Sequence, residues 1–167
     1  PARVPLGGQG SWFSKWAGVR ISASATLILA GADARTETGE IQLTDYGISG
    51  IPVFQLSRFA VRALDEGCSV LVRLDFLPGY ERENLHTYLE WRREQCPYKT
   101  LQQSLIGLVP DRLIPLVASA EADIPQTVSF LKGFPVGHRG AATLAQAQVF
   151  SRAASPQDLP EHLAHLK

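Results

Sequence analysis

Alternating hydrophobic and polar residues predict strands in several parts of the chain. Every second residue is apolar over 19–29, and the same pattern recurs over 69–76. A period of two places the apolar side chains on one face of a strand. A shorter alternating run covers 40–45, after a turn and a polar partner strand over 31–38 that ends at Gly39. We therefore expect a sheet built from neighbouring antiparallel strands.

A long helix is predicted directly after the turn at residues 46–50. Its polar residues recur every three or four positions and form one stripe, whereas apolar residues cover most of the remaining circumference. We expect such a helix to pack on more than one side. Ser49 is the expected N-cap, Pro52 is tolerated in the first turn, and Gly67 is expected to end the helix.

Short helices punctuated by proline are predicted beyond Pro78-Gly79. The amphipathic stretch 80–96 carries many charges, and three further short helices follow at 100–108, 110–120 and 123–132. Prolines begin or interrupt these last segments, because proline is tolerated only in the first turn of a helix.

The elements together predict an α+β fold. We expect a small antiparallel β-barrel or curled sheet with one long packed helix, and an inserted helical subdomain. Strand character returns over 134–150 around a glycine-rich turn. Residues 1–79 with 133–150 would form the barrel-like domain, 80–132 the helical subdomain, and 151–167 a tail.

Composition changes this picture little. The 167 residues include 16 basic and 16 acidic side chains, so the net charge is zero, and we do not expect a nucleic-acid partner for this domain. We find no apolar run of membrane-spanning length and no signal peptide. Cys68 and Cys96 lack a CxxC partner, which favours free thiols in the cytoplasm. The chain contains no Met, even at position 1, so we expect a piece of a longer protein.

Candidate chemistry concentrates in the turn that precedes the long helix. The residues concerned are Thr44, Asp45, Tyr46, Gly47, Ser49 and Gly50. They bring hydroxyls and a carboxylate to a helix N-terminus, where free amides attract anions. The alternative is structural: Ser49 caps the helix, Asp45 holds the turn, and the glycines permit positive φ. The residue pattern alone favours this structural role, because helix caps are far commoner than binding sites.

Other constellations give weaker signals. The glycines at 7–10 and 137–140 lack the strand and helix that a dinucleotide-binding loop requires. A catalytic set of Ser49, His138 and Asp45 lacks the nucleophile-elbow motif. The four histidines are scattered, and we assemble no metal site from them; they are His86, His138, His162 and His165. No catalytic residue is assigned.

The central stretch resembles a known family. Residues 39–52 read GEIQLTDYGISGIP and are followed by QLSR at 55–58. This run is similar to a motif of the BaiN/YhiN-like flavoproteins, which are FAD-dependent oxidoreductases often described as NAD(P)/FAD-dependent or aminoacetone-oxidase-like. Further matches are PARVPL at 1–6, AGVR at 17–20, FPV at 134–136, Gly140, and AQV at 147–149.

The resemblance covers about residues 1–149 and implies an architecture. In the family, the FAD-binding Rossmann-like domain is split around an inserted barrel-plus-helical domain, which this segment resembles. The family's Gly-Gly after AQV is replaced by Phe150-Ser151, and the flavin-binding motifs that follow it are missing. The chain would thus be the substrate-side cap domain of an FAD-dependent oxidoreductase, and is not expected to be catalytic alone.

The resemblance also implies partners and cofactors. The expected partner is the FAD-binding domain of the same parent chain, and the turn at 44–50 is the candidate surface facing that domain or the substrate. FAD would belong to the parent, with the use of NAD(P)H open and no cofactor in this chain. The parent's substrate is also open, because family members have been linked to steroid-like substrates and to a base in ribosomal RNA.

Two other functions remain as alternatives. The chain could be a stand-alone interaction module without catalytic activity that binds through the helical block 80–132. A weaker alternative is a small hydrolase built on Ser49.

Overall fold

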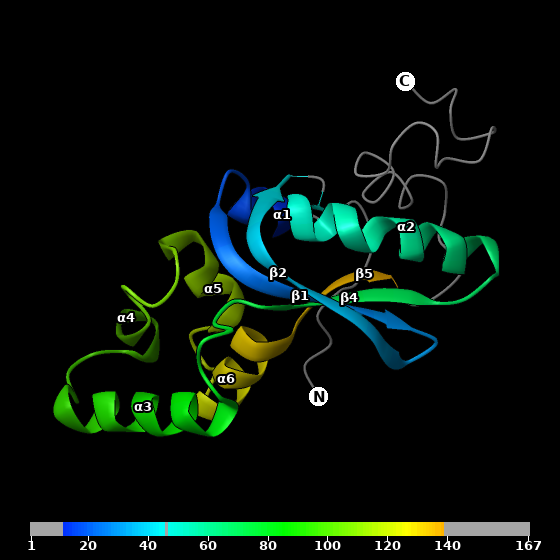
Figure 1. Cartoon of the computed structure of the whole chain (residues 1–167). Coiled ribbons are helices and arrows are strands. Elements are labelled where there is room, and N and C mark those ends of the chain that lie inside the picture. The colour runs from blue at the N-terminus through cyan, green and yellow to red at the C-terminus, as the bar shows by residue number, and fades with distance from the viewer. Residues whose placement is uncertain (1–11, 46, 139–167) are drawn as a thin grey trace.

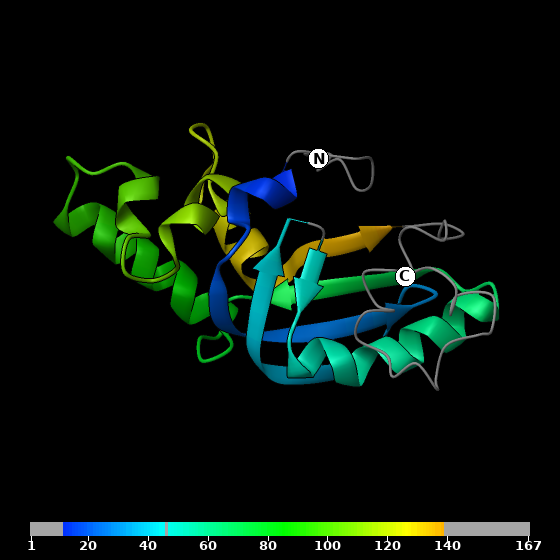
Figure 2. The same cartoon turned by 90° about the horizontal axis from the view of Figure 1, so that it is seen from above.

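A computed structural model describes residues 12–45 and 47–138. Its strands form one five-stranded sheet in the order β3-β2-β1-β4-β5, and every neighbouring pair is antiparallel. The sheet curls as a half-barrel (Figures 1 and 2), which confirms the predicted α+β fold. The strands are β1 Arg20–Leu29, β2 Ala32–Thr44, β3 Gly47–Ser49, β4 Val70–Asp75 and β5 Phe134–His138.

The helices form two groups in space. Figure 1 shows α2 lying along the sheet, whereas α3 to α6 gather beyond one end of the strands. The short α1 precedes β1 and contacts both β2 and the helical group. The helices are α1 Trp12–Trp16, α2 Ile51–Asp65, α3 Arg82–Gln95, α4 Leu101–Ser104, the 3-10 helix η1 Asp111–Leu113, α5 Ile114–Val117 and α6 Ile124–Gly133.

The second strand is longer than the sequence predicts. We expected Gly39 to separate two strands, but β2 runs without a break from Ala32 to Thr44 and pairs with β1 on both sides of this glycine. The reason for a glycine here is close packing, because a Cβ atom on Gly39 would lie 3.1 Å from Cγ of Pro52. Glycine within a strand commonly marks such an approach of another element.

The long helix buries one broad face. Its buried residues pack on the inward side of the sheet, where alternate residues of β1, β2 and β4 are also buried. The outer stripe predicted from the sequence is exposed at Gln55, Arg58, Arg62 and Glu66. The expectation of packing on more than one side is wrong for the described residues, since Ile51 and Phe54 remain 70% and 42% exposed.

The helical segment after β4 is more broken than predicted. The expected helix at 100–108 shortens to α4, and the one at 110–120 divides into η1 and α5. The first ends at Ser104 with Leu105 as its C-cap, and Gly107, with a φ of 87°, lies in the turn that follows. Pro115 lies in the first turn of α5. The strand predicted at 134–150 is observed as β5, and its remainder lies outside the described residues.

Trp16 joins the two ends of the described chain. Its side chain is fully buried, and its ring lies 5.5 Å from Phe13 and 5.6 Å from Phe134, measured between ring centroids. The indole Nε1 donates a hydrogen bond of 2.9 Å to the backbone oxygen of Thr44. Trp16 therefore connects α1, the end of β2 and the start of β5.

A lysine connects the sheet to the helical segment. Nζ of Lys132, near the end of α6, lies 2.6 Å from Oδ2 of Asp75 at the end of β4. The same nitrogen donates a hydrogen bond of 2.8 Å to the backbone oxygen of Leu77 and another to that of Tyr80. The Lys132 side chain is only 11% exposed. One ammonium group thus holds the chain where it leaves the sheet for α3.

Candidate functional site

The candidate turn is a tight hairpin between β2 and β3. Thr44 pairs with Gly47, and Gln42 pairs with Ser49. Oγ1 of Thr44 donates a hydrogen bond of 3.1 Å to the backbone oxygen of Gly47, while the backbone oxygen of Thr44 accepts the Trp16 bond. Asp45 is exposed at the tip. The turn is therefore anchored on both sides and presents its carboxylate outward; Tyr46 lies outside the described residues.

The N-cap of α2 is Gly50. The expectation that Ser49 caps the helix is wrong, because Ser49 belongs to β3 and no side-chain hydrogen bond caps α2. Gly50 has a φ of 118°, and a Cβ atom there would lie 2.5 Å from the backbone oxygen of Glu40. Only glycine allows this conformation without strain. The chain can therefore turn from strand to helix while lying directly against β2.

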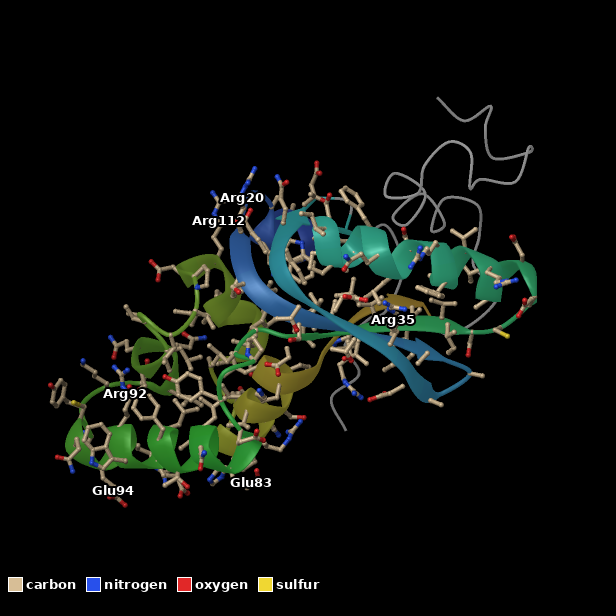
Figure 3. The ribbon with its side chains drawn as sticks, in the orientation of Figure 1. Arg20, Arg35, Glu83, Arg92, Glu94 and Arg112 are labelled. Atoms are coloured by element: carbon tan, nitrogen blue, oxygen red, sulfur yellow. The ribbon has the colours of Figure 1, made fainter. Side chains whose placement is uncertain are left out.

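A surface hollow of about 410 Å³ opens beside this turn. On one side it is lined by residues of β1 and β2, and on the other by the first turn of α2. The Arg20 and Glu40 side chains pair across its rim at 3.1 Å and are both more than half exposed. Figure 3 shows Arg20 near the start of β1, beside the beginning of α2. The lining residues are Arg20, Thr38, Gly39, Glu40, Gln42, Ser49, Gly50, Ile51, Pro52 and Phe54.

Ser49 and Gly50 thus reach the hollow, but Asp45 does not line it. The hollow combines polar groups on the strand side with apolar groups on the helix side. Such a mixed, open surface suits contact with another macromolecular surface or with part of a ligand. Sequence reasoning missed the contributions of Arg20, Glu40 and Ile51. It expected the long helix to pack on more than one side, whereas Phe54 on this helix is 42% exposed. The available signal was that α2 has more apolar residues than one buried face requires.

The structure does not assemble the Ser–His–Asp set. Ser49 pairs with Gln42, which pairs with Arg20 at the start of β1. His138 pairs with Val70, which pairs with Leu29 at the other end of β1. The two positions are separated by most of the length of this ten-residue strand, about 30 Å at the usual rise per residue.

The remaining histidines offer no alternative centre in the described residues. His86 lies on the surface of α3, with Nδ1 3.7 Å from Oε2 of Glu90. His162 and His165 lie outside the described residues, as do the glycines at 7–10. Within residues 12–45 and 47–138, no group of three His, Cys, Asp or Glu side chains is placed to hold a metal ion.

The described part of the chain does not fit a flavin dinucleotide. Its sheet is antiparallel throughout, whereas a Rossmann-like site needs a parallel strand–helix–strand unit with a glycine-rich phosphate loop. The glycine-rich segment before α2 is instead a hairpin followed by a glycine N-cap. We also find no helix among the described residues with the length and hydropathy needed to cross a membrane.

Comparison with known proteins identifies the family. The family described as "HI0933-like protein barrel and H2TH domain" matches residues 1–149. A curated relative, the 3-dehydro-bile acid delta(4,6)-reductase of Clostridium scindens, is 44% identical over 115 residues. That alignment covers 69% of this chain but 28% of the relative, so the chain spans less than a third of the reductase it matches. Because the family match includes the whole curled sheet and the whole helical segment, the chain belongs to the BaiN/YhiN-like family and carries its barrel and H2TH domain.

Proposed function

We propose that this chain is the inserted, substrate-side domain of an FAD-dependent oxidoreductase. The observation that carries the proposal is the match of 69% of the chain to 28% of a reductase. Because the described residues do not fit a flavin, the longer protein would bind FAD elsewhere. Flavin supplies redox chemistry that side chains alone do not provide. The isolated chain is therefore expected to be inactive, and its task would be to cover and shape a site held mainly by another domain.

The proposed division of labour follows the layout of the elements. Residues 1–79 with 133–150 would form the barrel-like part, which carries the turn and the hollow, and 80–132 the helical part. Thr44, Asp45, Ser49 and their neighbouring glycines would face the flavin-binding domain or the substrate. Two features support this role: the hairpin is held in place by Trp16, and the Asp45 side chain is exposed. A rigid support of this kind positions a polar group for a partner surface.

The first test is the absorbance of the purified proteins. We expect the longer protein that contains this segment to carry bound flavin, with its characteristic visible bands, and the 167-residue chain to remain colourless after incubation with FAD. A gene that encodes only these residues, or a longer protein that binds no flavin, would instead favour the stand-alone interaction module.

The second test concerns the turn. In the flavin-loaded longer protein, we expect Asp45→Ala and Ser49→Ala each to lower the rate of flavin reduction or substrate turnover roughly tenfold, because one lost hydrogen bond costs about 1 kcal/mol. Glu94→Ala and Ser119→Ala are matched controls, because both residues are exposed in the helical segment. Unchanged rates in both turn variants would remove the turn from the site, whatever the flavin content.

A further inference from the structure

The first turn of α2 exposes two large apolar side chains on one side of the helix. Ile51 and Phe54 are 70% and 42% exposed, and their spacing of three places them next to each other on the helix surface. The neighbouring residues Val53 and Leu56 are almost fully buried against the sheet. The buried face of α2 is therefore complete without Ile51 and Phe54, and the described chain does not need this pair for its packing.

Another aromatic residue of the same helix shows how the chain covers such a side chain itself. The Phe59 ring lies under the guanidinium groups of Arg35 and Arg58, each 4.8 Å from the ring centroid. Phe59 is half-buried and also packs against the main core, which neither Ile51 nor Phe54 does. The beginning of α2 has a different arrangement, because its nearby cation, Arg20, pairs with Glu40 across the hollow.

The helical segment also exposes aromatic residues, but these are partly engaged within the chain. The Trp91 ring stacks against Tyr88 with 6.1 Å between centroids, and the Tyr98 hydroxyl donates to Sγ of Cys96. Ile51 and Phe54 instead border a hollow that also contains an ion pair and the Ser49 position. A hollow with an apolar wall and a polar rim has the composition of a protein–protein interface, with an apolar centre and charges at its edge.

We infer that Ile51, Phe54 and the Arg20–Glu40 pair form the docking surface for the flavin-binding domain of the longer protein. The inference of this helix-start surface rests on the proposed function. The curated relative is more than three times as long as the segment that aligns with this chain, so a longer protein would contain a further domain to dock there. The surface is continuous with the turn through Ser49 and Gly50. The partner surface would insert an apolar side chain into the hollow and would place polar groups opposite Arg20 and Glu40.

Hydroxyl-radical labelling of side chains tests this surface directly. We expect labelling of Ile51 and Phe54 to fall roughly fivefold or more in the longer protein relative to the 167-residue chain, because the centre of an interface excludes water. Labelling of Trp91 and Tyr98 should stay the same in both proteins. Equal labelling of Ile51 and Phe54 in the two proteins, or protection of Trp91 and Tyr98 in their place, would overturn the inference.

A pair of variants provides a second measurement that does not depend on the isolated chain. In the longer protein, Phe54→Ser should raise the rate of limited proteolysis at the domain junctions severalfold, whereas Tyr98→Ser should leave it unchanged. Phe54 is already partly exposed, so this change is not expected to unfold the core. Equal proteolysis of both variants and the unaltered protein would contradict docking through this surface.

The flavin content of the same samples separates the two hypotheses. A flavin-loaded protein with Ile51 and Phe54 freely labelled keeps the proposed function and rejects this surface. A protein without flavin in which both residues are protected rejects the flavoprotein assignment and retains the surface as a domain contact. A coding sequence limited to these 167 residues would overturn both.

Discussion

At the scale of single residues, Gly50 shows how closely sequence and geometry are linked at the candidate site. It has the φ of 118° that turns the chain from β3 into α2, and it leaves no room for a side chain against Glu40. Gly50 also lines the hollow. A substitution here is therefore expected to affect both the stability and the shape of the surface.

We expect Gly50→Ala to lower the free energy of unfolding by about 2 kcal/mol or more, because the new Cβ adds backbone strain and a clash with the oxygen of Glu40. Urea denaturation monitored by circular dichroism measures the change. Gly79→Ala is the matched control, since a Cβ at Gly79 meets no atom within 4 Å and its φ is not in the left-handed region. Similar losses in both variants would argue against a special role for Gly50.

Sequence reasoning expected a turn over 46–50, but residues 47–49 form β3 and pair with β2. Ser49 has the residue type of an N-cap, yet the strand continues through it and Gly50 takes that position. The preference for serine at an N-cap amounts to only about 1 kcal/mol. Pairing of β3 with β2 outweighs this local preference. A pattern read over the residues around Ser49 does not include this pairing.

At the scale of elements, the connection between β4 and α3 is held by one charged group. Lys132 on α6 bonds to Asp75 and to two backbone oxygens of the intervening chain. The backbone N–H of Leu77 in turn donates to Oδ1 of Asp75 at 2.9 Å. The chain also donates from Phe76 N to Leu131 O at 2.9 Å. Together these bonds fix the direction in which the helical segment leaves the sheet.

Lys132→Met is expected to destabilise the protein by about 2 kcal/mol, because three acceptors lose a charged donor and Asp75 loses its ion-pair partner in a mostly buried place. Differential scanning calorimetry gives the shift in melting temperature. Hydrogen exchange should increase most in residues 76–81. Lys99→Met, at an exposed lysine, is the control. If Lys132→Met behaved like this control, the contacts of Lys132 would contribute nothing measurable to stability.

Regular periodicity and tertiary contacts also differ in how well they could be predicted among the elements. The strands β1 and β4 and the long helix were predicted because their periodicity is regular over six or more residues, whereas the three-residue β3 was not predicted. The helices at 100–108 and 110–120 were predicted too long. A φ of 87° at Gly107 does not allow a helix through residue 108, and Pro115 lies in the first turn of the separate helix α5. Gly39 was read as a break, although close packing against Pro52 is what requires it.

At the scale of the whole molecule, Trp16 connects segments that are far apart in the chain. It contacts Phe134, more than a hundred residues away, and bonds to the backbone of Thr44 at the candidate turn. Arg112 adds a second long-range link, since its Nη1 donates to the backbone oxygen of Ala17 at 2.5 Å. The position of the candidate surface therefore depends on these contacts between segments that are distant in the sequence.

Trp16→Phe should cost about 1–3 kcal/mol of folding free energy, because it leaves part of the indole volume empty and removes the donor to Thr44. Trp91→Phe, at a residue that is 54% exposed, is expected to change stability by about 0.5 kcal/mol or less. Chemical denaturation of both variants measures the two values. A Trp91 loss equal to or greater than the Trp16 loss would contradict this assignment.

The sequence by itself determined the alternation of strands, the amphipathic α2 and the family resemblance, because periodicity and motif are properties of neighbouring residues. Only the tertiary structure decided which apolar residues of α2 are buried, where its N-cap lies, and that Arg20 and Glu40 border a hollow beside Ile51 and Phe54. These features arise where β1, β2 and α2 meet. Such meetings depend on strand register and on the absence of a side chain at Gly39 and Gly50, and no local window of sequence contains both partners.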